Sequence, residues 1–115
     1  TPWEIDTRDR ILFIEDISER PYRIDRMLNQ LRLAGKLEEA LGFVIGDWCD
    51  CGPEEGKRSL SIDEVLRDHL ESTGKPILSN LGVGHCRPNY TLPLGVEVEI
   101  DGDAKTLDIL EAATA

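Results

Sequence analysis

The residues best suited to chemistry lie in one irregular stretch, residues 82–95, which reads GVGHCRPNYTLPLG. Its three glycines and two prolines are incompatible with a regular helix or strand and predict a loop held in one particular shape. His85 is the residue of this loop that titrates near neutral pH. Because well-ordered loops often carry function, we take His85 as a candidate general base.

A carboxylate that could act with His85 lies far upstream. The apolar run ILFI at residues 11–14 ends in Glu15 and Asp16, a pattern typical of a buried strand with acids at its carboxyl end. The loop containing His85 follows another short strand, predicted at residues 77–80. Open α/β sheets bind ligands at the carboxyl ends of their strands, so we expect Glu15 to orient the imidazole, leaving its other nitrogen to act as a base. The alternative is a structural histidine and a solvated acid.

The chain offers no evident nucleophile for this pair. None of the serines, at positions 18, 59, 61, 72 and 79, lies in a G-x-S-x-G context, and Ser61 is expected to cap a helix. Cys86 directly follows His85, but adjacent side chains on an extended backbone point apart, which disfavours a couple between them. The nucleophile would have to come from elsewhere.

Metal binding fits the pattern less well, and we expect neither a metal nor a cofactor. Cys49 and Cys51 are separated by one residue, whereas zinc sites use two to four, and no second matched pair follows. His69 falls on the inner stripe of a predicted helix, where a histidine is more often a packing residue than a ligand.

A phosphoacceptor domain is a further alternative. The predicted strands near residues 11–16, 44–48 and 76–79 loosely resemble those of a response-regulator receiver, in which Asp47 would be phosphorylated. However, a single helix separates Glu15 from Asp47, where a receiver needs an additional strand and helix. Asp47 is therefore interpreted as a buried acid or a turn residue.

The strands and helices that must position Glu15 and His85 alternate along the sequence. This alternation predicts a small single α/β domain spanning residues 1–115. It should have a parallel βαβ core, two main helices and a C-terminal antiparallel hairpin. The hairpin turn is expected at Asp101-Gly102, and the second helix should begin with a capping box formed by Ser61 and Glu64. The expected helices span residues 21–35 and 61–74, and the expected strands residues 11–14, 42–48, 77–80 and 96–100, with a last strand around 107–109.

Charge and composition narrow the function further. With 23 acidic and 13 basic residues the net charge is −10, which disfavours nucleic acid and anionic membranes as partners. The apolar runs are too short to span a bilayer, and the start lacks a signal-peptide pattern. Three cysteines do not suggest a secreted disulfide framework, so a cytoplasmic location is expected. The start at Thr1-Pro2, without an initiator methionine, suggests a piece of a longer protein.

Three stretches in order closely resemble the C-terminal domain of LD-carboxypeptidases, the muramoyltetrapeptide carboxypeptidase family. They are ILFIEDISERPYRIDRMLNQLRLAG, a GFVIGDW strand and GVGHCRPNYTLPLG, and the resemblance runs from Trp3 to about Leu110. It implies the swivelling β/β/α domain of a two-domain serine peptidase. An N-terminal domain, absent from this chain, would supply the serine and the oxyanion hole, while Glu15 and His85 would complete a Ser-Glu-His triad.

The resemblance also implies a substrate and partners. The family removes the terminal D-alanine from cytoplasmic murein tetrapeptides during peptidoglycan recycling, generally as a homodimer and without metal, so this chain alone should be inactive. A related branch cleaves a peptide-nucleotide antibiotic and confers microcin immunity, but the PYRIDRM and NYTLPLG segments are more similar to the recycling branch. A non-catalytic binding or dimerisation module is the alternative from another class.

Four further residues are expected to support the pair. Gly84 and Asn89 would shape the loop behind the imidazole through backbone hydrogen bonds. Tyr22 and Arg23 of the PYRID segment would brace the loop after Glu15 or a dimer surface, or else only fix the entry to the helix.

Overall fold

Short strands and helices alternate along the chain in the computed structural model, which describes residues 3–53, 55–56, 58–85, 87 and 89–112. The elements in order are β1 (Ile11–Ile17), α1 (Pro21–Leu33), α2 (Lys36–Glu39), β2 (Gly42–Cys49), α3 (Ile62–Leu70), a 3-10 turn (Glu71–Thr73), β3 (Ile77–Leu78), β4 (Val98–Asp101) and β5 (Thr106–Ile109).

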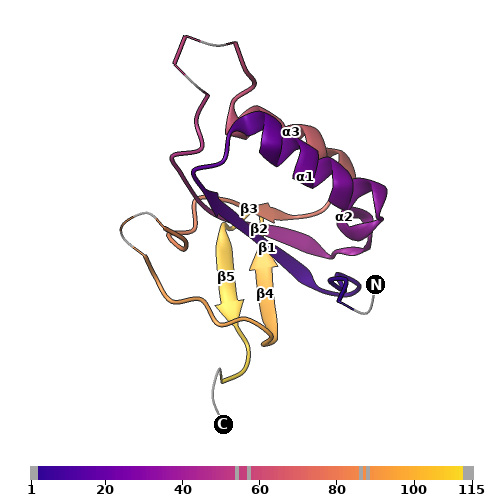
Figure 1. Ribbon diagram of the computed structural model, residues 1–115. Coiled ribbons are helices and arrows are strands. Elements are labelled where there is room, and N and C mark those ends of the chain that lie inside the picture. The colour runs from indigo at the N-terminus through magenta and orange to yellow at the C-terminus, as the bar shows by residue number, and fades with distance from the viewer. Residues whose placement is uncertain (1–2, 54, 57, 86, 88, 113–115) are drawn as a thin grey trace.

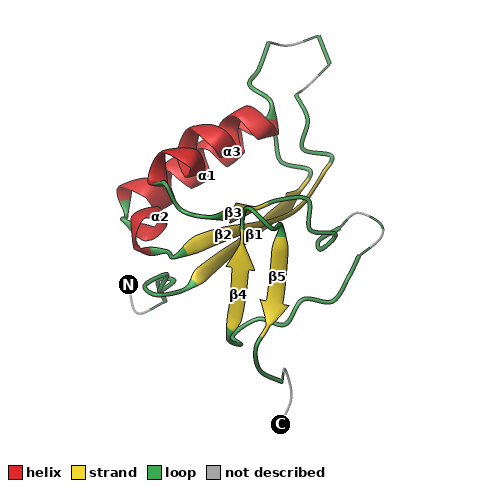
Figure 2. Cartoon of the chain, turned by 180° about the vertical axis from the view of Figure 1, so that it is seen from behind, coloured by secondary structure: helices red, strands yellow, loops and turns green. Residues whose placement is uncertain are grey.

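The first three strands form a parallel sheet in the order β1-β2-β3. The helices all lie on one face of this sheet, and the β4-β5 hairpin lies on the other side, as Figure 1 and the reverse view in Figure 2 both show. This arrangement confirms the predicted parallel core with two main helices and a C-terminal antiparallel hairpin. The carboxyl ends of β1, β2 and β3 therefore share one edge.

The hydrophobic core fills the space between the sheet and the helices. Alternate residues of each strand face the helices, so Ile14 of β1 and Ile45 of β2 pack into the same layer. The helices contribute buried side chains from their inner faces, Ile24 and Leu28 from α1 and Val65 and Leu70 from α3. Burial of this shared layer fixes the register of β1 against β2.

Two local signals in the sequence set the helix starts as expected. Pro21 occupies the first turn of α1, where its missing N–H costs nothing. In α3 the Ser61 side chain accepts a hydrogen bond from the Glu64 amide, and the Glu64 carboxylate accepts one from the Ser61 amide. The predicted capping box is thus confirmed.

Several strand predictions differ from the structure at their ends. β1 continues to Ile17, so Glu15 lies within this strand and not after residue 14, and β4 begins at Val98 and not at residue 96. The third strand comprises only Ile77–Leu78 and does not continue to residue 80, because Asn80 has a positive φ of 60° that turns the chain away from the sheet. The prediction of a two-residue hairpin turn at Asp101-Gly102 is also wrong, because the connection between the strands is longer. The strands pair up to Asp101 and Thr106, which leaves a four-residue connection, residues 102–105.

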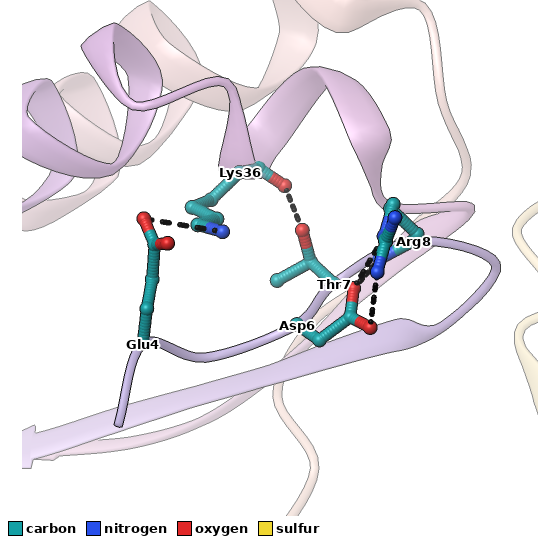
Figure 3. Close-up of polar contacts among 5 residues, drawn as sticks. All are labelled: Glu4, Asp6, Thr7, Arg8 and Lys36. Atoms are coloured by element: carbon teal, nitrogen blue, oxygen red, sulfur yellow. Dashed lines mark hydrogen bonds and ion pairs between the residues drawn. The ribbon is translucent and has the colours of Figure 1, made fainter. Parts of the chain in front are cut away.

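The segment before β1 is fastened to the start of α2 (Figure 3). Thr7 is 1% exposed, and its Oγ1 donates a hydrogen bond of 2.7 Å to the Lys36 carbonyl oxygen. The Lys36 ammonium lies 3.3 Å from the Glu4 carboxylate, and Arg8 pairs with Asp6. These contacts hold the segment at the amino edge of the sheet, opposite the edge that carries Glu15.

In the parts of the chain that the structure describes, no helix combines the length and the apolar character needed to cross a bilayer.

Candidate active site

A β-bulge at the carboxyl end of the sheet places Glu15. Ile14 pairs with Ile45, but Asp16 pairs with Trp48, so two residues of β2 stand opposite Glu15 alone. Those two residues are 46 and 47, a glycine and an aspartate. Bulges bend a strand and redirect its side chains. Here the bulge interrupts the β1–β2 ladder at Glu15.

The loop after β3 docks on this bulge through its backbone. The Asp47 amide donates to the Val83 carbonyl oxygen at 2.8 Å, and the Leu81 amide donates to the Ile45 carbonyl oxygen at 3.3 Å. Gly46 permits this approach, because a Cβ at this position would lie 2.4 Å from the Val83 oxygen. The loop is thereby positioned by β2, the central strand of the sheet.

Gly84 brings the loop against the Glu15 carboxylate. Its φ is 142°, and a Cβ there would lie 3.1 Å from Glu15 Oε2 and 3.0 Å from Asp47 Cβ. The Gly84 amide donates to Asn89 Oδ1 at 3.2 Å, and the Tyr90 amide donates to the Gly82 carbonyl oxygen. The two residues expected to shape the loop, Gly84 and Asn89, are therefore in direct contact with each other.

Glu15 and His85 meet in a hydrogen bond. His85 Nδ1 and Glu15 Oε2 are 3.1 Å apart, and the two side chains are 52% and 25% exposed. A carboxylate only accepts hydrogen bonds, so the proton of this bond belongs to Nδ1. The second ring nitrogen, Nε2, is left to accept a proton from a group outside the pair.

Tyr22 and Arg23 lie at the start of α1 and form no hydrogen bond or ion pair with the Glu15–His85 pair. Tyr22 is 57% exposed, and the Arg26 guanidinium lies 5.8 Å from the centre of its ring. Arg23 pairs with Glu19 at 3.6 Å, and contact with Tyr22 and Glu19 raises the pKa of Arg23. Arg23 thus contacts the segment that follows Glu15, while Tyr22 points to the helix surface.

His69, the other histidine, lies apart from this pair. It is 3% exposed between α3 and α1, and its Nε2 lies 2.6 Å from Asp25 Oδ1. The sequence indicated a packing residue, which its burial confirms. The couple weighed between Cys86 and His85 falls outside the described residues. Within the described part of the chain, no three His, Cys, Asp or Glu side chains are grouped to hold a metal ion.

Cys51 is a buried thiol between the sheet and the helices. It is 1% exposed, packs in the cluster with Ile24 and Val65, and its Sγ donates to the Cys49 carbonyl oxygen at 3.2 Å. Burial raises the pKa of the Cys51 thiol above its ordinary value of 9.0. The neutral thiol, and not the reactive thiolate, is therefore the form that the fold favours.

Cys51 is expected to resist iodoacetamide at pH 7.5 in the folded chain and to react readily in urea, as followed by peptide mass mapping. Because its folded pKa is raised, the stability that it contributes is complete below about pH 9 and is lost as the pH rises through the folded value. Cys51→Ala should therefore lose less stability than the parent chain between pH 8 and pH 10. Rapid alkylation of Cys51 itself in the folded chain would contradict the burial of its thiol.

Sequence reasoning missed the bulge and the part played by Gly46. A glycine inside a predicted buried strand was the available signal, because such a glycine often marks a bulge or the close approach of another backbone. Asp47 was interpreted as a buried acid or turn residue, and its Oδ2 is indeed buried. Its position beside Glu15 depends on the bulge and was not predicted.

Comparison with known proteins identifies relatives over almost the whole chain. A family model described as the LD-carboxypeptidase C-terminal domain matches residues 1–100. A Bacillus subtilis protein named "Probable murein peptide carboxypeptidase" is 45% identical over 115 residues, which is 100% of this chain and 36% of that protein.

Solved structures agree with the fold. The crystal structure of muramoyltetrapeptide carboxypeptidase from Oxalobacter formigenes matches with a TM-score of 0.70 and 34% identity, covering 85% of this chain and 34% of that one. The microcin C7 self immunity protein MccF, in complex with aspartyl sulfamoyl adenosine, matches with a TM-score of 0.81 and 31% identity, covering 98% and 33%. The chain thus spans about a third of the length of each of these proteins.

Proposed function

The chain belongs to the LD-carboxypeptidase C-terminal domain family, and from this premise we propose that it forms the C-terminal catalytic half of a serine-type LD-carboxypeptidase. The observation that carries the proposal is the hydrogen bond between His85 Nδ1 and Glu15 Oε2. It provides an oriented base whose second nitrogen can accept a proton, and no serine among the described residues is hydrogen-bonded to that base. The nucleophile and the oxyanion hole would come from an N-terminal domain.

In the proposed reaction the serine oxygen attacks the carbonyl carbon of the scissile amide while His85 Nε2 takes the proton of the serine hydroxyl. Glu15 stabilises the imidazolium that results. The same proton then passes to the amide nitrogen as the C–N bond breaks and D-alanine leaves. Water, activated by His85, hydrolyses the acyl-enzyme and regenerates the serine. No metal or cofactor takes part in these steps.

We propose a murein tetrapeptide as the substrate and peptidoglycan recycling in the cytoplasm as the setting. The 45% identity to a protein named as a murein peptide carboxypeptidase supports this choice. A peptide-nucleotide of the microcin type is the second candidate, favoured by the higher TM-score of 0.81 against MccF. A homodimer of the full protein is part of the proposal and follows the family resemblance.

The proposed function is tested by supplying the N-terminal domain that would carry the serine. The N-terminal domain of the parent protein is produced separately and mixed with this chain, and D-alanine release from a murein tetrapeptide is measured. We expect no release from either half alone and release from the mixture or from the full-length protein. A peptide-nucleotide substrate is assayed in parallel, and preferential cleavage of it would favour the microcin branch.

A binding or dimerisation module without chemistry is the alternative class. It predicts that the full-length protein carrying His85→Ala keeps the same hydrolytic activity as the parent, or that neither protein has any. It also predicts that this chain self-associates without the N-terminal half, which sedimentation at several concentrations would detect.

A further inference from the structure

Asp47 carries a buried carboxylate oxygen that its surroundings leave without a partner. Its Oδ2 is shielded from solvent and accepts no hydrogen bond from any residue that the structure describes. Buried polar atoms in proteins are nearly always hydrogen-bonded, and an exception calls for an explanation. Removing a carboxylate from water is costly, so a fold that retains an unpaired one loses stability by doing so.

The position of Asp47 connects this oxygen to the candidate site. Asp47 belongs to the β2 bulge that stands opposite Glu15. A single point, the place where a Cβ on Gly84 would lie, is 3.0 Å from Asp47 Cβ and 3.1 Å from Glu15 Oε2. Asp47 and Glu15 therefore both lie against Gly84, the residue that precedes His85.

The backbone of Asp47 has a separate task that does not need the carboxylate. Its amide donates to the Val83 carbonyl oxygen at 2.8 Å and so anchors the loop. Any residue except proline provides that hydrogen bond. The acidic side chain, placed next to another acid and without a partner, is thus not explained by the folding of the loop.

We propose that Asp47 is a positioning residue that acts on His85 through Glu15. The Glu15 carboxylate on β1 is bonded to His85. Asp47 on β2 lies against the glycine that precedes His85, and the one cation nearby in the sequence of this loop is Arg87. Two neighbouring carboxylates favour the protonated imidazole more than Glu15 alone does. Asp47 therefore helps His85 to hold the proton that it takes from the nucleophile.

This assignment predicts opposite effects of one substitution on stability and on titration. Asp47→Asn has nearly the same shape but removes the charge of a half-buried carboxylate and its repulsion with Glu15, so the melting temperature should rise or stay the same. The NMR titration midpoint of the His85 ring should fall by about half to one pH unit, as expected when one nearby negative charge is removed at a partly exposed site. A side chain that only supports the fold would give a lower melting temperature and an unchanged midpoint.

The chain contains its own internal control for this measurement. His69, the second histidine, is bonded to Asp25 between the helices, and its midpoint should not move. Asp68→Asn serves as the matched variant, because it removes the same charge from an exposed position on α3. Asp47→Ala is tested beside Asp47→Asn, so that a folding defect in one variant does not decide the result.

The catalytic consequence rests on the proposed function and is measured separately in the full-length protein. Asp47→Asn should lower kcat for D-alanine release three- to tenfold with little change in KM, and should move the acidic limb of the pH–rate profile to lower pH. A fall in the His85 midpoint without any hydrolysis would uphold the link between Asp47 and His85 and contradict the peptidase. An unchanged midpoint in both variants would overturn the role of Asp47, whatever the activity.

Discussion

Replacing His85 by glutamine in the full-length protein is expected to lower kcat/KM for D-alanine release from a murein tetrapeptide by at least about a hundredfold. Glutamine is similar in reach but cannot accept and return a proton, so the serine would lose its general base. The exposed position of His85, with 52% of the side chain accessible, indicates that this change leaves the fold intact. Circular dichroism and the melting temperature should confirm this.

Glu15→Gln tests the other half of the pair. Its amide can still face His85 Nδ1, but it no longer stabilises an imidazolium, so a loss of similar size is expected. Asp16→Asn is the matched control, since Asp16 is the next residue on β1 and its carboxylate bonds to the Ile17 amide. Combining Glu15→Gln with His85→Gln should cost hardly more than His85→Gln alone. Losses below a hundredfold in the single variants would argue against the triad roles.

Gly46→Ala is expected to destabilise the chain by about 2–4 kcal/mol, a large effect for one methyl group. The added Cβ would lie 2.4 Å from the Val83 carbonyl oxygen and 2.9 Å from the Phe13 ring. The first of these contacts is with backbone, which cannot rotate away. Relief requires the loop to leave β2, which breaks the hydrogen bond from the Asp47 amide to Val83.

The loss of stability in Gly46→Ala is measured by urea unfolding of this chain, followed by tryptophan fluorescence. Gly52→Ala is the matched control, because nothing lies within 4 Å of the place that its Cβ would occupy, and its free energy of unfolding should change by less than about 0.5 kcal/mol. Equal stability of the two variants would show that the loop does not depend on close contact with the bulge. The His85 ring signals should also shift in Gly46→Ala if the loop is displaced.

The meeting of Glu15 and His85 could be predicted from the sequence, because parallel strands end at one edge of the sheet, where the last part of β1 carries Glu15 and the loop after β3 carries His85. The capping box of α3 could also be predicted from the sequence, since it depends on two residues that are three positions apart. The bulge was not predicted, because Gly46 was the only hint of it within GFVIGDW, and a glycine inside a strand does not by itself distinguish a bulge from a regular strand. The pairing of Asp25 with His69 could not be predicted either, because it joins two helices whose relative rotation is set by packing.

The attachment of the N-terminal segment to α2 bears on how the two proposed halves work together. Thr7 and Lys36 hold this segment at the amino edge of the sheet, and Glu15, four residues beyond the start of β1, lies roughly 13 Å further along at 3.3 Å per residue. The proposed N-terminal domain would thus be tethered at the end of the sheet far from His85. The tether would raise the effective concentration of the serine, but alignment would have to come from contact between the domains. A break in the tether should therefore be tolerated wherever the two halves still dock.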